Sequence, residues 1–245
     1  MTKIDMHAHY GVWNFPIPEA GTAENLLRLC DRHDVEYAVC SSAEAILYDM
    51  EAGNEAMAEV CAEHERLLGY VYVNPNFIER SVRQMEQYLP EDDFVGVKIY
   101  TNGYTKVPAD AECFRDLFGE IARLSTVVLV HTGSAATVAT LAEYAQMYPD
   151  LNIILGHAAA RESDKAAQYA AKHSNMYLEF CSSWAGYGKV ERAVNICGAG
   201  QIVYGSDMDL IDPAFVIGMY EDADLTDDER AMIYRENAAS LLGLQ

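Results

Sequence analysis

The sequence lacks long apolar runs and is poor in basic residues. No stretch reaches the roughly 18 uninterrupted apolar residues that a transmembrane helix requires, which argues against a membrane-spanning protein. Only 17 Lys and Arg residues stand against 38 Asp and Glu residues, giving a net charge of −21. Such an acidic surface would repel phosphate backbones and anionic lipids, so we expect neither nucleic acid nor a membrane as a partner.

Features of an exported protein are also missing. The six cysteines are scattered through apolar segments and form no CxxC pair, so we expect buried, reduced thiols and no disulfide framework. The opening residues, Met1 to His7, lack the apolar core of a secretory signal. We therefore expect a cytoplasmic protein.

No linker rich in proline or serine divides the chain, and this favours one domain over residues 1–245. What recurs is a short apolar run, then a polar loop, then a helical segment. The runs are rich in β-branched and aromatic residues, which is typical of strands. They are Ile4–His9, Tyr37–Ser41, Tyr70–Asn74, Val95–Tyr100, Val127–His131, Ile153–His157, Tyr177–Cys181 and Ile202–Asp207.

The intervening segments predict helices, each long enough to connect two parallel strands. They are Ala23–Arg32, Glu51–Glu65, Glu79–Tyr88, Ala111–Leu124, Ala136–Met147, Asp164–His173, Lys189–Cys197 and Thr226–Leu242. Thr226 with Glu229 forms a capping-box pattern, and Gly243 lies where a C-cap glycine belongs. Eight βα units match an α/β fold of the (β/α)8 TIM-barrel type, although a doubly wound open sheet uses the same alternation.

Polar residues near the carboxyl ends of five runs favour the barrel. They are potential metal ligands or bases: His7, His9, Lys98, His131, His157 and Asp207. In a barrel the carboxyl ends of all strands converge at one mouth, so residues from the first and eighth strands can share a site. In an open sheet these two strands need not meet.

Strand alternation predicts which side chains face the interior. It places Asp5, His7 and His9 on one face, and it points Lys98 and Glu179 inward. A buried lysine is costly unless it is paired, neutral or chemically modified. Lys98 could pair with Glu179 or Asp5, bind a substrate carboxylate, or carry a carbamate. Glu179 and Asp5 are expected to support metal ligands rather than to bind metal.

Six motifs on these segments resemble the amidohydrolase superfamily, most closely its family-2 branch of small single-domain barrels. They cover nearly the whole chain in order. The motifs are Asp5-Met6-His7-Ala8-His9, Gly96-Val97-Lys98-Ile99, Val130-His131-Thr132-Gly133, Leu155-Gly156-His157-Ala158, Tyr204-Gly205-Ser206-Asp207 and Glu236-Asn237-Ala238-Ala239-Ser240-Leu241-Leu242-Gly243.

The resemblance implies a divalent metal, with zinc expected first and manganese, nickel or iron as alternatives. His7, His9 and Asp207 would bind it. In members with one ion the fourth ligand maps to His131, and His157 orients or deprotonates the water. In members with two ions His131 and His157 hold the second ion, and a carbamylated lysine at position 98 bridges both. Many one-ion relatives lack this lysine, so the sequence leaves open whether the site holds one ion or two.

The chemistry expected first is hydrolysis of an amide, lactone or ester bond in a small organic molecule by metal-activated water. Asp207 would pass the water proton to the leaving group, and His157 would stabilise the tetrahedral oxyanion. The alternative is non-oxidative decarboxylation, since the branch contains aminocarboxymuconate-semialdehyde decarboxylase and resorcylate decarboxylase. Few cations near the mouth favour hydrolysis. A barrel that binds metal without turnover is the third possibility.

Residues after the strands suggest the substrate pocket. Tyr10, Trp13, Tyr100 and Trp184 are candidates for an aromatic wall, although such residues also pack ordinary loops. Arg161 could bind a substrate carboxylate in bidentate fashion or pair with a surface acid. The expected partner is thus a small molecule, and homo-oligomerisation is an open expectation.

Overall fold

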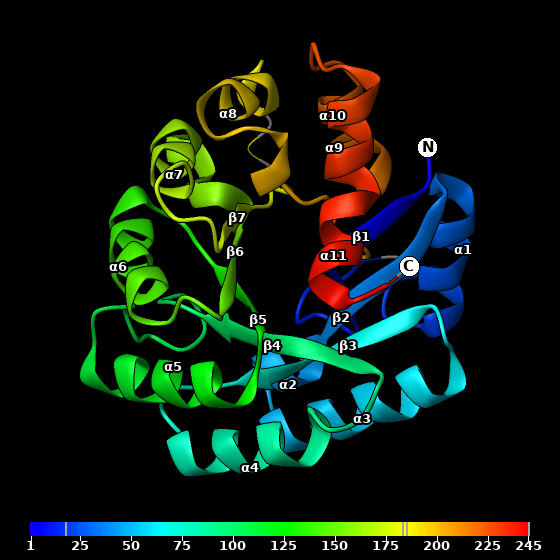
Figure 1. Ribbon diagram of the computed structural model, residues 1–245. Helices are drawn as coiled ribbons and strands as arrows, with labels where there is room; N and C mark the ends of the chain where they lie inside the picture. The colour runs from blue at the N-terminus through cyan, green and yellow to red at the C-terminus, as the bar shows by residue number, and fades with distance from the viewer. Residues whose placement is uncertain (18, 183, 185, 245) are drawn as a thin grey trace.

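Seven parallel strands form one curved sheet in the described part of the computed structural model, and helices surround it (Figure 1). The structure describes residues 1–17, 19–182, 184 and 186–244. The strands pair in chain order. They are β1 (Lys3–Tyr10), β2 (Val35–Ser42), β3 (Leu67–Val73), β4 (Phe94–Tyr100), β5 (Val127–His131), β6 (Asn152–Gly156) and β7 (Met176–Leu178).

Each pair of neighbouring strands is connected through at least one helix, and each expected helical segment contains one. The helices are α1 (Ala23–His33), α2 (Ala43–Leu47), α3 (Met50–Glu63), α4 (Ile78–Tyr88), α5 (Glu112–Leu124), α6 (Ala135–Met147), α7 (Ser163–Ala170), α8 (Lys189–Cys197), α9 (Pro213–Glu221), α10 (Asp227–Ala231) and α11 (Asn237–Leu242). The sequence did not predict α2 and α9. Among the described helices, none is long and apolar enough to cross a membrane.

The last expected helix is divided rather than continuous. A π-helical turn, Met232–Glu236, separates α10 from α11. The predicted capping box is present, because the Thr226 side chain accepts from the Glu229 N–H and the Glu229 carboxylate accepts from Thr226. Gly243 ends α11 at a φ of 67°, a left-handed conformation that favours glycine.

The expected eighth strand, Ile202–Asp207, does not form as a strand. Residues 202–208 instead make isolated bridges to β7 and β1, at Leu178–Ile202 and Ala8–Met208. Regular pairing is limited because β7 has only three residues and Asp207 has a φ of 61°. The structure is therefore a single α/β domain with a curled parallel sheet of seven strands, and residues 202–208 occupy the place expected for the eighth.

A bulge in β1 corrects the predicted orientation of Asp5. The register of β1 with β2 shifts between residues 5 and 8, and an extra residue of this kind interrupts the alternation of side chains. Met6 packs in the interior cluster, whereas Asp5 bonds to Ser206 and lies near Cys30 of the helix layer. The prediction that Asp5 shares a face with His7 and His9 is therefore wrong.

Two hydrophobic layers support the site. The outer layer packs the helices against the sheet, with Leu26 and Phe118 among its fully buried residues. The inner layer fills the sheet's concave side and includes Ile4, Tyr70 and Leu129. Close packing on both faces restricts the movement of the strands that carry the polar residues.

Candidate metal centre

His9 and Asp207 lie at the centre of the polar site. His9 Nε2 is 2.9 Å from Asp207 Oδ1, and His7 Nε2 is 3.6 Å from the same oxygen. The ligand atoms of these three residues lie within 4.8 Å of one another. Both His9 Nε2 and Asp207 Oδ1 are buried, and apart from this mutual contact neither has a hydrogen-bond partner among the described residues. Two imidazole nitrogens and a carboxylate oxygen that converge in a buried place fit a shared cation.

The protonation states also fit a metal site. Burial, followed by the nearby Lys98, lowers the pKa of His7 well below its usual value. Burial, followed by the neighbouring His157, does the same to the pKa of His131. Burial would raise the pKa of Asp207, but contacts with His9 and His7 outweigh burial and hold it well below its usual value. Neutral imidazoles and an ionised carboxylate are the forms that bind divalent metals.

Lys98 comes to this centre from the end of β4. Its fully buried Nζ lies 2.7 Å from His7 Nε2 and 5.2 Å from the centroid of the Tyr100 ring. Burial lowers the pKa of Lys98 to about 8. No carboxylate of the described residues forms an ion pair with it. The suggested ion pairs of Lys98 with Glu179 or Asp5 are therefore absent.

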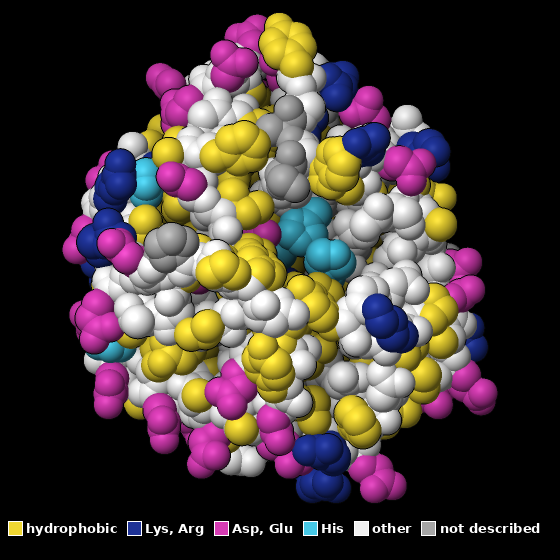
Figure 2. Space-filling view, turned by 180° about the vertical axis from the view of Figure 1, so that it is seen from behind, with side chains coloured by type: hydrophobic (Ala, Val, Ile, Leu, Met, Phe, Trp, Pro, Cys, Tyr) yellow, Lys and Arg dark blue, Asp and Glu magenta, His cyan; other side chains and the backbone are white. Residues whose placement is uncertain are grey.

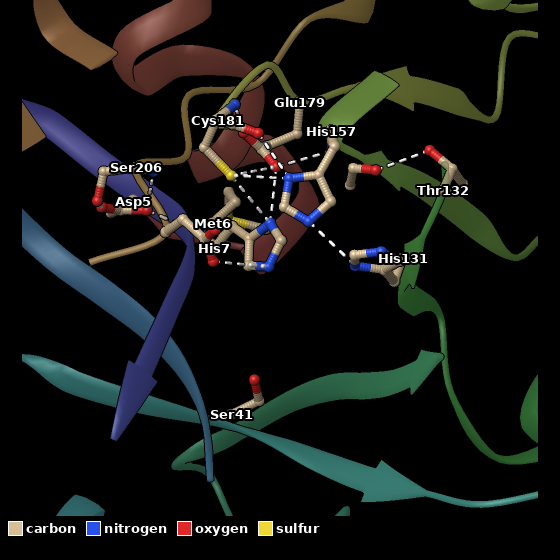
Figure 3. Close-up of polar contacts among 12 residues, drawn as sticks. Asp5, Met6, His7, Ser41, His131, Thr132, His157, Glu179, Cys181 and Ser206 are labelled. Atoms are coloured by element: carbon tan, nitrogen blue, oxygen red, sulfur yellow. Dashed lines mark hydrogen bonds and ion pairs between the residues drawn. The ribbon is translucent and has the colours of Figure 1, made fainter. Parts of the chain in front are cut away.

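Glu179 orients two of the histidines. Its Oε2 lies 2.7 Å from His7 Nδ1 and accepts the backbone N–H of His157 at 3.3 Å (Figure 3). The carboxylate also accepts the backbone N–H of Cys181 and its thiol. Burial raises the pKa of Glu179, although the nearby His157 side chain and the two Cys181 donors oppose the shift. Because Glu179 occupies Nδ1 of His7, the opposite nitrogen faces Lys98 and Asp207.

His157 and His131 form a second pair of imidazoles beside the first. His157 Nε2 is 3.1 Å from His131 Nδ1, and the His157 and His7 ring centroids are 5.0 Å apart. His157 Nδ1 lies 2.6 Å from the carbonyl oxygen of Cys181, a distance suited to donation by Nδ1–H. In the neutral ring Nε2 then carries the lone pair, which is the form that a metal ligand requires.

The backbone after β6 is strained at His157. Residues His157, Ala158, Ala159 and Ala160 have φ values of 66°, 44°, 60° and 53°. Left-handed conformations cost non-glycine residues about 1–2 kcal/mol each. Thr132 holds the turn, because its hydroxyl accepts the Ala159 N–H and donates to the Gly156 carbonyl. Strain of this kind is common where a functional side chain must be aimed.

Asp5 and Ser41 position the two histidines of β1. Asp5 accepts hydrogen bonds from the Ser206 backbone and hydroxyl and from the His7 N–H. Burial raises the pKa of Asp5 to about 7. The Ser41 hydroxyl lies 3.0 Å from His9 Nδ1, so the other ring nitrogen, His9 Nε2, is directed toward Asp207. Both first-strand histidines are thus fixed through their Nδ1 atoms.

A cavity of about 440 Å³ opens beside these residues, hereafter the site cavity. Figure 2 shows histidine side chains in a hollow bordered by hydrophobic groups. The described residues that line the cavity are His131, Thr132, Gly133, His157, Ala160, Ser182, Trp184, Asp207, Leu210 and Ile211. Apolar groups make up the larger part of the exposed cavity surface, and His131, His157 and Asp207 contribute to its polar part, as in small-molecule sites.

The predicted pocket residues fall into different places. Trp184 lines the site cavity, and Tyr100 stacks on His131 with ring centroids 4.5 Å apart. Trp13 packs edge-on against His9 at 4.9 Å. Arg161 lies in the adjoining cavity, with its guanidinium 3.8 Å from the centre of the Trp184 ring. Tyr10 instead packs with the helix-side cluster, because it follows His9 and points to the opposite face.

Sequence reasoning missed several residues of the site. Cys181 was interpreted only as a buried thiol, yet its sulfur lies 3.3 Å from His7 Nδ1. Ser41 ends a predicted strand, and a polar residue at that position was the available signal. Leu210 and Ile211 follow Asp207 in an irregular segment, where no periodic pattern marks the cavity wall. All six cysteines are free, and four of them are buried as expected, whereas Cys113 and Cys197 are only half-buried.

Comparison with known proteins identifies relatives of the whole chain. A family model described as amidohydrolase matches residues 4–244. No curated protein matches the chain. A 2,6-dihydroxybenzoate decarboxylase from Rhizobium has a similar structure, with 16% identity, a TM-score of 0.81 and coverage of 99% of this chain and 98% of that chain.

Two further solved structures have the same fold. A dihydroxybenzoic acid decarboxylase from Polaromonas sp. JS666, with bound manganese and 2-nitroresorcinol, has 17% identity, a TM-score of 0.79 and coverage of 99% and 97%. A 5-carboxyvanillate decarboxylase from Sphingomonas paucimobilis has 13% identity, a TM-score of 0.79 and coverage of 100% and 99%. At these identities the likeness concerns the fold.

Proposed function

Because the chain belongs to the amidohydrolase family, we propose that it is a divalent-metal-dependent, non-oxidative decarboxylase of a small aromatic carboxylic acid. The observation that carries the proposal is that the buried ligand atoms of His7, His9 and Asp207 converge beside a cavity that Asp207 lines. Decarboxylation converts a charged carboxylate into neutral carbon dioxide, so apolar walls favour the products over the solvated acid. Hydroxybenzoate decarboxylases among the structurally similar proteins support this choice over hydrolysis.

The metal would be held by His7, His9 and Asp207, with His131 and His157 beside them. When bound, a divalent cation supplies positive charge that binds the acid and stabilises negative charge as it develops on the substrate. We propose manganese or zinc, because imidazole and carboxylate suit both. Manganese is bound in the Polaromonas relative.

Asp207 is proposed to move the proton. The bond between the ring carbon and the carboxylate carbon breaks, carbon dioxide leaves, and the electron pair stays on the ring carbon. A proton that Asp207 has taken from a substrate hydroxyl or from solvent then forms the new C–H bond. Asp207 lines the site cavity and is ionised in the free protein, so it can accept that proton.

His157 and Trp184 are proposed to position the acid. Both line the site cavity, and His157 is held by Glu179 and the Cys181 carbonyl. The indole offers a flat apolar surface to an aromatic ring. The neutral His157 ring donates from Nδ1 to Cys181, so stabilisation of an oxyanion by Nε2–H would require a protonated ring.

Hydrolysis of an amide, lactone or ester is the second candidate, and Lys98 favours it. Its buried amine has no carboxylate partner among the described residues, and it contacts His7. A carbamate on Lys98 would convert this cation into an anion able to join two metal ions, as in the two-ion members that the sequence resembles. Asp207 would then pass a water proton to the leaving group.

The test is a substrate panel with protein loaded separately with manganese and zinc. Hydroxybenzoates, lactones and N-acyl compounds are compared, and carbon dioxide and the organic products are measured. We expect one carbon dioxide per arene formed, with a loss of at least about 100-fold in Asp207→Asn. Formation of an acid or amine without carbon dioxide would replace the proposal by hydrolysis. Silence with metal bound would favour a non-catalytic barrel.

A further inference from the structure

A second cavity of about 430 Å³ adjoins the site cavity, and both are lined by Ala160 and Trp184. We refer to it as the basic cavity. Its described lining consists of Ala160, Arg161, Ser163, Trp184, Gly186, Lys189 and Arg192, which includes three basic residues and no acidic one. In a chain of net charge −21, this concentrates positive charge next to the site.

Arg161 has hydrogen-bonding capacity that the described residues leave unused. Its guanidinium stacks on the Trp184 ring at 3.8 Å, so the planar group is held in place by an aromatic surface. The structure gives it no hydrogen bond or ion pair within the described residues. A guanidinium carries five N–H donors in a fork that matches a carboxylate, and none of the described residues accepts from those of Arg161.

Lys189 adds a buried ammonium group to the same cavity. The residue is only 2% exposed, and its Nζ donates to the backbone oxygen of Trp184 at 2.9 Å. An ammonium has three N–H donors, so this bond leaves donors for a ligand. Arg192 contributes less, because it pairs with Asp164 at 3.2 Å.

The backbone adds positive potential to these side chains. Helices α7 and α8 begin at Ser163 and Lys189, and both residues line the basic cavity. The first N–H groups of a helix lack intrahelical partners and carry partial positive charge. The Lys189 N–H already donates to the Gly186 carbonyl, so the helix starts add partial positive charge to the side chains rather than further donors.

We propose that the basic cavity binds a second carboxylate of the substrate, through Arg161 and Lys189, and that the substrate is an aromatic dicarboxylic acid. That the other carboxylate of this acid is the group that reacts rests on the proposed function. The shared Ala160 and Trp184 let one molecule extend from the site cavity into the basic cavity, with its ring against the indole. Recognition of the remote group would then place the reacting carboxylate beside Asp207.

Calorimetric titration of metal-loaded protein tests the proposal without turnover. The probes are benzoate, benzene-1,3-dicarboxylate and benzene-1,4-dicarboxylate. We expect one dicarboxylate to bind at least about tenfold more tightly than benzoate, as a charged bidentate contact would give. Arg161→Gln should remove this difference between the dicarboxylate and benzoate. Lys165→Gln, which removes a 62% exposed cation of α7 outside the cavity, should keep the difference.

Each outcome decides a separate point. Equal binding of all three probes, no binding of any, or a difference that survives Arg161→Gln would overturn the second-carboxylate site. Tighter binding of 4-phosphonobenzoate than of the 1,4-dicarboxylate would overturn the carboxylate assignment in favour of a phosphoryl group. A difference that depends on Arg161, in a protein that releases no carbon dioxide, would support the anion site and refute the decarboxylase.

Discussion

The Glu179 carboxylate lies 2.7 Å from His7 Nδ1, and this contact decides which nitrogen of the ring faces the site. Both side chains are fully buried. Ligating histidines commonly donate their second N–H to a carboxylate, which fixes the ring and raises its basicity. The same carboxylate accepts the backbone N–H of His157, so one acidic residue organises an imidazole of β1 and another in the turn that follows β6.

Glu179→Gln should weaken metal binding without unfolding the protein. The amide is similar in shape to the carboxylate, but it is neutral and cannot accept on both sides. We expect the affinity for manganese or zinc to fall about 10- to 100-fold, the usual effect of losing such a support. Competition with a chelator measures it. Glu59→Gln, the same change at an exposed position, is the control, and equal affinities of the two variants would refute the role of Glu179.

Lys98→Met should stabilise the metal-free protein. Lys98 is fully buried without a carboxylate partner among the described residues, and a buried unpaired charge costs free energy. Methionine fills similar volume without the charge, so the free energy of unfolding should rise by about 1–2 kcal/mol. Urea unfolding measures the change. Lys165→Met, at an exposed site, should stay within about 0.5 kcal/mol of the wild type, and a destabilised Lys98→Met would contradict the prediction.

Gly53→Ala should destabilise the contact between α2 and α3. A Cβ at Gly53 would lie 2.1 Å from the backbone nitrogen of Ala45, which cannot move without displacing α2. Overpacking of this kind costs about 1–3 kcal/mol. Gly218→Ala in α9 is the matched control, because nothing lies within 4 Å of its Cβ position. It should be neutral or stabilising by up to about 1 kcal/mol. Thermal unfolding of both variants in parallel compares them.

The buried cysteines should resist alkylation in the folded protein. Burial raises the pKa of Cys30 and of Cys61 to about 12 from 9.0. The thiolate is the reactive form, so at about pH 8 these residues should stay unmodified while half-buried Cys113 reacts first. Peptide mass spectrometry after iodoacetamide treatment measures the order in which the cysteines are alkylated.

The same shifts predict a loss of stability in alkali. Each raised thiol pKa contributes stability that is complete below the unfolded value near 9 and is lost as pH rises toward 12, because only the unfolded thiols ionise. The free energy of unfolding should therefore fall over this range. A profile that is flat above pH 9 would contradict the burial of these two thiols.

Much of the candidate site could be predicted from the sequence, because its residues stand at strand ends. His7, His9, Lys98, His131 and Asp207 lie near the carboxyl ends of four predicted runs, and parallel strands bring such ends to one edge. The inward direction of Lys98 and Glu179 followed from simple alternation, and both contact His7.

The features that could not be predicted from the sequence have local physical causes. The bulge in β1 depends on pairing with β2, so alternation along one strand could not place Asp5. The eighth strand contains the right residues, but the left-handed backbone at Asp207 prevents regular pairing. The basic cavity joins residues of two loops and two helix starts, none of which shares a periodic pattern. For this reason the sequence predicted few cations near the mouth of the barrel, although the basic cavity lies there.

The bond between Asp5 and Ser206 also constrains synthesis of the protein. A ribosome releases His7 and His9 early, but it adds Asp207 only when most of the chain has been made. Until then the two imidazoles have neither the carboxylate nor the backbone segment that holds them in place. Completion of the proposed site of His7, His9 and Asp207 must therefore be one of the last events of folding, and a chain truncated before Ser206 should lack this site.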